Sequence, residues 1–116
     1  MSNVEFCSER ILEIDSIVIA SLAAPKEKIW GQLIMLSQAG VTIRGIELNA
    51  FDDFVRQLAR QEENSIELTT VFYPMHRVER IATDQPSGSI PSLSDQFRRQ
   101  VGVSIKEYLG LETPQV

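Results

Sequence analysis

The chain has little of several features that specific functions require. Its single cysteine, Cys7, permits no disulfide within the chain and no zinc site built from several thiolates. It has one histidine, His76, and its six glycines nowhere form the Gly-x-Gly-x-x-Gly or P-loop patterns that cradle phosphates. We therefore expect neither a metal ion nor any other cofactor.

Positive charge is also scarce. Eleven Lys and Arg residues stand against sixteen Asp and Glu residues among 116, which gives a formal net charge of −5. Proteins that bind duplex DNA usually carry a basic excess, because neutralising phosphates drives their affinity. The charge balance argues against a specific duplex-DNA partner and leaves only a local basic patch to be considered.

Long hydrophobic runs are missing as well. The longest apolar run, residues 17–24, contains Ser21 and is far too short to span a bilayer. Residues 1–16 carry four acidic side chains and lack the basic start and apolar centre of a secretory signal. We expect a cytoplasmic protein with no membrane partner.

What is present is a series of short apolar segments typical of strands. β-branched residues dominate from Ile11 to Ile19, a polar break follows at 24–28, and a second strand is expected at 29–36. Ser37-Gln38-Ala39-Gly40 predicts a tight turn into a third strand over 41–48, which alternates cleanly. Two more strands, 66–73 and 75–82, flank Pro74, so that an edge position, a bulge or a bend is expected there. Val78 and Ile81 are three residues apart, so both reach the core only if a bulge or a 3₁₀ turn intervenes.

Two segments have helical periodicity. Residues 49–60 place Phe51, Phe54, Val55 and Leu58 on one face, with Asn49 as the expected N-cap and an Asp52–Arg56 pair on the exposed side. Near the C-terminus a short amphipathic helix is predicted from three apolar residues, with Ser92 or Ser94 as its cap and Gly102 as its end. Ser104 and Glu107 predict a capping box for one more helical turn. The three apolar residues are Leu93, Phe97 and Val101.

These elements follow the order β-β-β-α-β-β-α, with connections between strands too short for repeated βαβ crossovers. We predict a mainly β (α+β) fold: a small, strongly bent, five-stranded antiparallel barrel with an inserted helix at about 49–61 and a short C-terminal helix. The whole of 1–116 is expected to form one domain, with an N-terminal arm at 1–10 and a helical tail at 92–116.

His76 is the only candidate for acid–base catalysis by an imidazole. It would need Cys7, or a serine together with Asp84, and no local signature accompanies any of these residues. The simpler interpretation is a strand histidine whose ring bonds a carbonyl or carboxylate. We therefore predict that the chain is not an enzyme.

A local excess of arginine marks the segment after Pro74. In a strand, His76, Val78 and Arg80 would share one side, with Arg77 and Glu79 on the other. Arginines near an aromatic ring can hold phosphate or stack a base. The candidate ligand- or RNA-binding residues are therefore Arg44, Tyr73, His76, Arg77 and Arg80. In the alternative interpretation, Arg77 and Arg80 pair with Glu79 and Glu47 across the sheet.

The segment Ile29-Trp30-Gly31-Gln32-Leu33 resembles the bent strand of the Sm-like small-barrel family, in which a glycine lets the backbone curve. Ile43-Arg44-Gly45 is similar to the Ile-Arg-Gly signature of that family, and residues 74–81 resemble the last strand of SH3-like barrels. The resemblance implies a small barrel, ring-like assembly through edge strands and, by analogy, RNA as a ligand. The Asp and Asn of the family's RNA pocket are absent from the loop at 37–40.

The predicted function is a non-catalytic Sm-like binding or scaffold module that forms a homo-oligomer through its edge strands. An open sheet edge favours such pairing, since a neighbour's strand can cover it. RNA is the candidate ligand of the arginine-bearing face. Two alternatives stay open: a cytoplasmic adaptor for another protein, recruited by the arm and by the loop at 85–91, and a small enzyme that uses His76.

Overall fold

The predicted five-stranded antiparallel sheet is present in the computed structural model, which describes residues 12–62 and 66–112. The fold is α+β and mostly β. The described residues divide into two compact units, a sheet unit and a helical unit. The sheet unit contains the described residues up to Leu48 together with Leu68–Thr83, and the helical unit contains Asn49–Glu67 and the residues from Asp84 onward. The N-terminal arm predicted at 1–10 lies outside the described residues.

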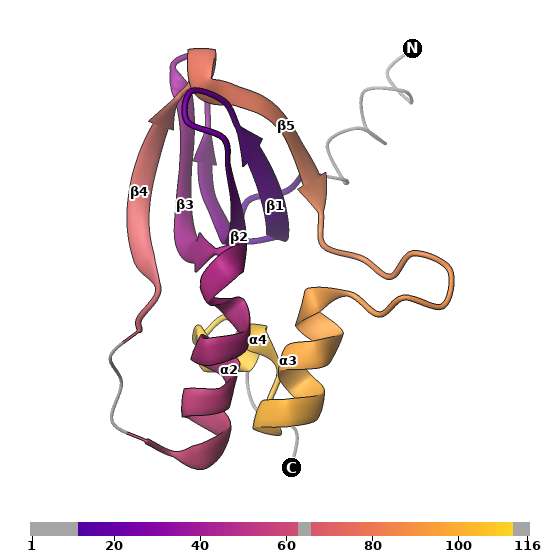
Figure 1. The fold of residues 1–116 in the computed structure, drawn as a ribbon. Coiled ribbons are helices and arrows are strands. Elements are labelled where there is room, and N and C mark those ends of the chain that lie inside the picture. Colours follow the sequence, from indigo (N-terminus) through magenta and orange to yellow (C-terminus); the bar gives the residue numbers. More distant parts are fainter. Residues whose placement is uncertain (1–11, 63–65, 113–116) are drawn as a thin grey trace. The chain divides into compact units, whose positions relative to one another are not determined.

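The sheet has the strand order β4-β3-β2-β1-β5, and all its neighbouring strands are antiparallel (Figure 1). β4 and β5 are therefore the two edge strands. The strands are β1 (Ile17–Leu22), β2 (Glu27–Leu36), β3 (Gly40–Glu47), β4 (Thr69–Pro74) and β5 (Val78–Thr83).

The predicted hairpin joins β2 and β3. Ser37 and Gly40 exchange two backbone hydrogen bonds, with N···O distances of 2.9 and 3.3 Å, which close the tight turn expected from the sequence. Pro74 is the last residue of edge strand β4, one of the positions at which a proline does not break a central ladder. Both features follow from local turn chemistry and are confirmed.

Three strand predictions were wrong in their bounds, and one of them is the fourth strand, which was expected from residue 66 and begins at Thr69. The first strand begins at Ile17, because the residues just before it form turns in which Ser16 N–H donates to the Glu13 carbonyl. Met75–Arg77 do not continue a strand but form the 3₁₀ helix η2. His76 and Arg77 consequently belong to a turn, and the predicted alternation of their side chains across a strand does not exist.

A β-bulge in β5 resolves the irregular spacing of its apolar residues. Ser21 of β1 pairs with Arg80 whereas the next residue, Leu22, pairs with Val78, so Glu79 is the extra residue. Val78 and Ile81 consequently both pack against the core, as the sequence predicted.

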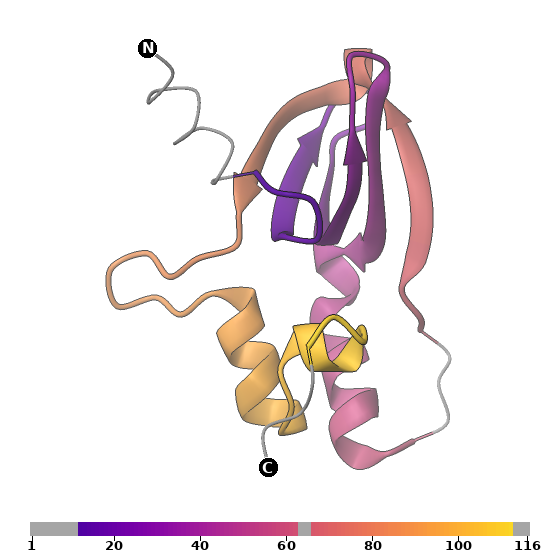
Figure 2. The ribbon, with the colours of Figure 1, turned by 180° about the vertical axis from the view of Figure 1, so that it is seen from behind.

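The sheet is strongly curved, because η2 joins its two edges. Pro74 pairs with Gly40, and Val78 pairs with Leu22. The four-residue step between them reaches at most about 14 Å, whereas the edges of a flat sheet of this order would lie about 19 Å apart. The edges therefore converge at the η2 end, and both views show β4 and β5 meeting there (Figures 1 and 2).

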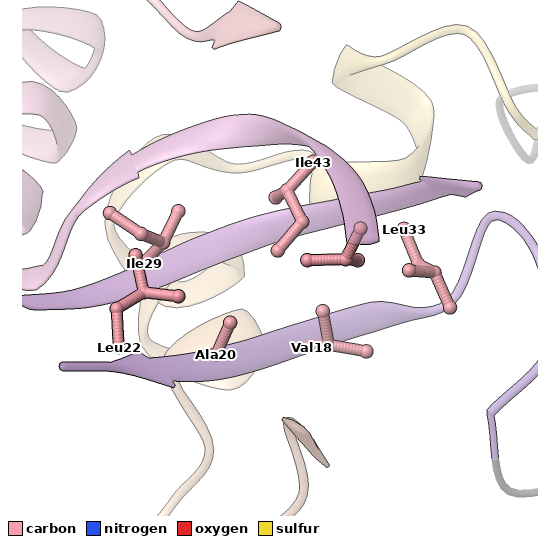
Figure 3. Packing of buried hydrophobic residues seen from close by; sticks show 7 residues of the cluster. Val18, Ala20, Leu22, Ile29, Leu33 and Ile43 are labelled. Carbon is pink, nitrogen blue, oxygen red and sulfur yellow. The ribbon is translucent and has the colours of Figure 1, made fainter. Parts of the chain in front are cut away.

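The concave face of the sheet holds the core of this unit. Alternate residues of β1, β2 and β3 point toward one another and are almost fully buried (Figure 3). On the same face Gly31 of β2 lies opposite Gly45 of β3. A Cβ on Gly31 would lie 2.5 Å from Gly45 Cα, so that neither position can carry a side chain at this spacing. The core residues are Val18, Ala20, Leu22, Ile29, Leu33, Val41 and Ile43.

The helical unit contains the two predicted helices and the additional turn. These are α2 (Phe51–Arg60), preceded by the 3₁₀ helix η1 (Leu48–Ala50), then α3 (Leu93–Val101) and α4 (Ile105–Tyr108). Ser92 and Ser104 each form a complete capping box, and Gly102 ends α3 in the left-handed region. Two details of α2 were wrong: its N-cap is Ala50 rather than Asn49, because η1 occupies 48–50, and Arg56 pairs with Asp53 rather than Asp52.

Three aromatic rings hold the helical unit together. Phe54 of α2 stacks on Phe97 of α3, with ring centroids 6.2 Å apart, and the Tyr108 ring meets both of them edge-on. Such pairs contribute beyond their buried area, because ring edges and faces carry opposite partial charges. The inserted helix and the C-terminal helices therefore share one core.

Candidate interaction site

Edge strand β4 is unusually exposed for its composition. From Leu68 to Pro74 the sequence Leu-Thr-Thr-Val-Phe-Tyr-Pro contains no acidic or basic residue. Val71 is 37% exposed and Phe72 is 53% exposed, although they lie on opposite faces of the strand. Protected edge strands usually carry charges that discourage pairing with another chain. β4 is thus open for pairing along its backbone and apolar on both faces.

Two further exposed apolar side chains lie at the end of β2 near this edge. Met35 is 55% exposed and pairs with Thr42, which in turn pairs with Phe72, so that one row of side chains crosses three strands. Leu36, at 39% exposure, follows on the other face. We call Met35, Leu36, Val71 and Phe72 the β4 corner. They are half of the large apolar side chains that are exposed in the described residues.

Phe72 is held in place by a glycine on the neighbouring strand. A Cβ added to Gly40 would meet two Phe72 ring carbons at 2.7 and 2.9 Å and would also clash with the Tyr73 carbonyl oxygen. The ring therefore covers the position that a side chain would otherwise occupy. This contact fixes the outward Phe72 ring on the surface of β3.

The opposite edge, β5, is different. Glu79 is the bulged residue and Arg80 follows it, and both are exposed. Charges and bulges are the two common means by which a sheet edge is kept from pairing. The two edges of this sheet are consequently unequal, and β4 is the one with neither a charge nor a bulge.

Tyr73, a predicted ligand residue, faces inward. It pairs with Val41, and its ring packs against the buried core of the sheet unit. Burial, together with the nearby carboxylate of Glu27 and, less strongly, that of Glu47, raises the pKa of its phenol, and Arg77 opposes part of this effect. The neutral phenol is therefore favoured, which suits a core residue better than a base-stacking surface residue.

Arg77, another of the predicted ligand-binding residues, is engaged within the fold. Its Nε donates to the Ala23 carbonyl at 3.0 Å, and its Nη2 donates to the Pro25 carbonyl at 2.9 Å and to Glu27 Oε1 at 2.8 Å. The Arg77 carbonyl in turn accepts from Ala23 N–H at 2.7 Å. Its carboxylate partner is thus Glu27, not the Glu79 or Glu47 of the alternative interpretation.

The other predicted site residues lie at separate places on the sheet unit. Arg44 points outward from the middle of β3, and Arg80 points outward from β5, three strand spacings or about 14 Å away along the sheet. His76 is exposed on η2. The structure therefore does not gather Arg44 and Arg80 with Tyr73 and Arg77 into one site, whereas His76 is the neighbour of Arg77 in η2.

Asp84 and Cys7 are the residues that were considered as catalytic partners of His76. Asp84 accepts from the N–H groups of Leu93 and Ser94, at 3.0 and 2.7 Å, and from the Ser94 hydroxyl at 2.6 Å. These bonds anchor the start of α3. Cys7 lies outside the described residues. Across the part of the chain that the structure describes, no three side chains of the kinds that bind metals come together.

The described helices are all too short or too polar to cross a membrane. Comparisons of the chain with models of protein families, with curated proteins and with solved structures find no match. The Sm-like resemblance thus stays a prediction.

The sequence analysis predicted edge-strand association but not the residues of the β4 corner. The absence of charge from residues 68–74 does not single out this strand, because residues 16–25 and 29–43 are also free of charged side chains. The exposure of Met35 and Phe72 was not available, since alternation shows which residues share a face and not which face stays uncovered.

Proposed function

We propose that this protein is a non-catalytic scaffold or binding module that assembles with copies of itself through the open edge of a small, barrel-like sheet. The observation that supports the proposal best is the β4 edge, which is neutral, exposed and bordered on both faces by apolar side chains. A strand of this kind pairs readily with a strand from another chain, because every second residue turns its backbone N–H and C=O to the free edge and the side chains gain by burial.

The barrel-like shape is part of the proposal. The two edge strands are joined by only three residues, and the N–H of Met75 donates to the Ala39 carbonyl at 2.9 Å while Ala23 N–H donates to Arg77. These bonds attach η2 to both hairpin turns and draw the edges toward each other. The resemblance to Sm-like barrels, which assemble into rings through edge strands, points in the same direction.

RNA binding receives less support than self-association. Arg77, one of the arginines predicted to contact phosphate, already donates to two carbonyls and a carboxylate. Arg44 and Arg80 lie on different strands, and a net charge of −5 supplies no general attraction for phosphate. RNA binding is therefore the second candidate function after self-association. We expect RNA to bind to the assembled form rather than to a single chain.

A protein-adaptor function keeps one specific observation in its favour. In the loop between β5 and α3, Ile90 is 66% exposed, and its backbone pairs with that of Ser87. An apolar side chain held out on a closed loop is a suitable contact for another protein. This contact would be compatible with assembly through β4.

Edge-blocking variants test the proposal. Phe72→Lys places a charge on the open edge and should convert a multimer into a monomer, because an inserted lysine is a common obstacle to strand pairing. The matched control is Ile90→Lys, which puts the same charge on a site that is at least as exposed but lies on a loop. Light scattering after size exclusion measures the mass. Equal masses for wild type and Phe72→Lys, with unchanged circular dichroism, would contradict the proposal.

A further inference from the structure

The backbone of β4 indicates which groups a partner strand would meet. A Cβ on Gly40 would clash with the Tyr73 carbonyl oxygen, so that carbonyl points toward β3. Backbone groups alternate in direction along a strand. The N–H and C=O of Thr70 and Phe72 therefore point to the free edge, and so does residue 74, where proline has no N–H to offer.

These positions suit pairing of β4 with itself. If two copies run antiparallel about a two-fold axis at Val71, Thr70 of each copy lies opposite Phe72 of the other. Each of these two pairs exchanges two N–H···O=C bonds, and Pro74 is left out of this four-bond core. A register centred on Phe72 would also form four bonds, two between the Phe72 residues and one in each Thr70–Pro74 pair, but it would leave each Thr70 carbonyl opposite a proline that has no N–H to donate.

The side chains agree with this register. Val71 of one copy would face Val71 of the other across a close, non-hydrogen-bonded pair, which buries two side chains that are each 37% exposed in the single chain. On the outer face, the ring of Phe72 would cover Thr70 of the partner copy. Because residues 68–74 carry no charged group, two copies meet here without like-charge repulsion, despite a net charge of −5 on each chain.

Pairing of β4 with β5 of the next copy fits less well. The bulge at Glu79 disturbs the regular spacing of β5, and the charges of Glu79 and Arg80 would have no oppositely charged partner on the neutral β4 strand. A closed ring built from β4–β5 contacts would leave these charges beside apolar side chains.

Building on the proposed self-association, we infer that the partner of β4 is β4 of a second copy, in an isologous dimer centred on Val71. The surface involved is the β4 corner together with Thr70. A two-fold contact of this kind uses the same strand twice and closes after two chains. Any larger assembly would then be built from these dimers.

Disulfide trapping in the full chain tests the register. In a Cys7→Ser background, Val71→Cys places two thiols on directly opposed residues whose Cα atoms lie about 4.5 Å apart, within the 4.4–6.8 Å range of a disulfide. Thr69→Cys is the control, since it lies on the same strand and the same face but would be opposite Tyr73 of the partner. We expect Val71→Cys to form the covalent dimer on the order of tenfold faster than Thr69→Cys, because pairing raises the local thiol concentration.

The outcomes separate this inference from the proposed function. A multimer whose Val71→Cys variant does not cross-link, or cross-links no faster than Thr69→Cys, overturns the β4–β4 dimer and leaves self-association standing. A wild type that is monomeric at all concentrations, with no preferential cross-link, overturns both. Preferential trapping of Val71→Cys, with native mass doubled before oxidation, supports both.

Discussion

Arg77 and Glu27, fifty residues apart in the chain, form a 2.8 Å ion pair that connects η2 to the start of β2. The same guanidinium donates to the Ala23 and Pro25 carbonyls, so one side chain attaches to the entire turn between β1 and β2. The two side chains are only 20% and 26% exposed, which shields the pair from solvent. The contact attaches η2 to the turn between β1 and β2, at the place where the curvature of the sheet brings its two edges together.

Removing this guanidinium should destabilise the sheet unit. Arg77→Ala leaves Glu27 and two carbonyls without their partner, and hydrogen bonds to charged groups contribute about 1.5–3 kcal/mol. We expect the free energy of unfolding to fall by about 2 kcal/mol, measured as a shift of the urea midpoint. Arg80→Ala, at an exposed arginine three residues away, should change it by less than about 0.5 kcal/mol. Equal losses in the two variants would mean that the guanidinium of Arg77 is not the stabilising group.

The facing glycines of β2 and β3 should tolerate no side chain. In Gly31→Ala the new Cβ would lie 2.5 Å from Gly45 Cα and 2.8 Å from the Arg44 carbonyl carbon, and backbone atoms cannot move aside without separating the strands. We expect a loss of about 3 kcal/mol or more, at the upper end of overpacking costs. Thermal unfolding followed by circular dichroism measures it.

Gly88→Ala is the control for this change. Gly88 has a positive φ of 58° but no heavy atom within 4 Å of its added Cβ, so only the cost of the left-handed backbone remains, about 1–2 kcal/mol. If Gly31→Ala were no more destabilising than Gly88→Ala, the close approach of the two strands would be refuted.

Tyr73 should make stability depend on pH in alkaline solution. Its pKa in the folded protein is raised above the usual 10.0, chiefly by burial. The unfolded chain therefore loses this proton first, and the stabilising contribution of the neutral phenol is complete below pH 10 and is lost as the pH rises through the folded pKa. Unfolding midpoints measured from pH 9 upward should fall less steeply in Tyr73→Phe than in wild type.

A direct titration checks the cause. The difference in tyrosinate absorbance between wild type and Tyr73→Phe isolates the phenol of Tyr73. Its midpoint should lie above 10.0 in the folded protein and return toward that value in denaturant. A midpoint at or below 10.0 in the folded state would contradict the inward, packed placement of this ring.

Local chemistry made much of the fold predictable from the sequence. The turn at Ser37–Gly40, the capping boxes of Ser92 and Ser104, and the apolar stripe of α2 all depend on residues within a few positions of one another. For Pro74 an edge position, a bulge or a bend was expected, and the structure shows the edge position. Such signals are contained in short segments and need no knowledge of the tertiary structure.

Contacts between distant segments were not predictable in this way. Arg77 was predicted to pair with carboxylates on neighbouring strands, because Met75–Arg77 were expected to lie in a strand. These residues form a 3₁₀ helix instead, which has no clear local signal and turns the Arg77 side chain toward Glu27. The arginine face combined the segment after Pro74 with Arg44 as a possible neighbour, and the sheet order separates Arg44 from Arg80. The β4 corner was missed for a related reason, since Met35 and Phe72 lie in one row only through the register of three strands.

The native mass of wild-type protein, purified gently without nuclease and measured by light scattering over a range of concentrations, tests self-assembly most directly. Assembly through β4 predicts a discrete multimer whose mass is a whole multiple of 13.1 kDa and whose ultraviolet spectrum shows protein alone. Additional nucleic-acid absorbance would bring the RNA ligand forward and make Arg44 and Arg80 the next residues to change. A monomer of 13.1 kDa at every concentration would contradict the account, because the neutral, apolar β4 edge would then have no copy to cover it.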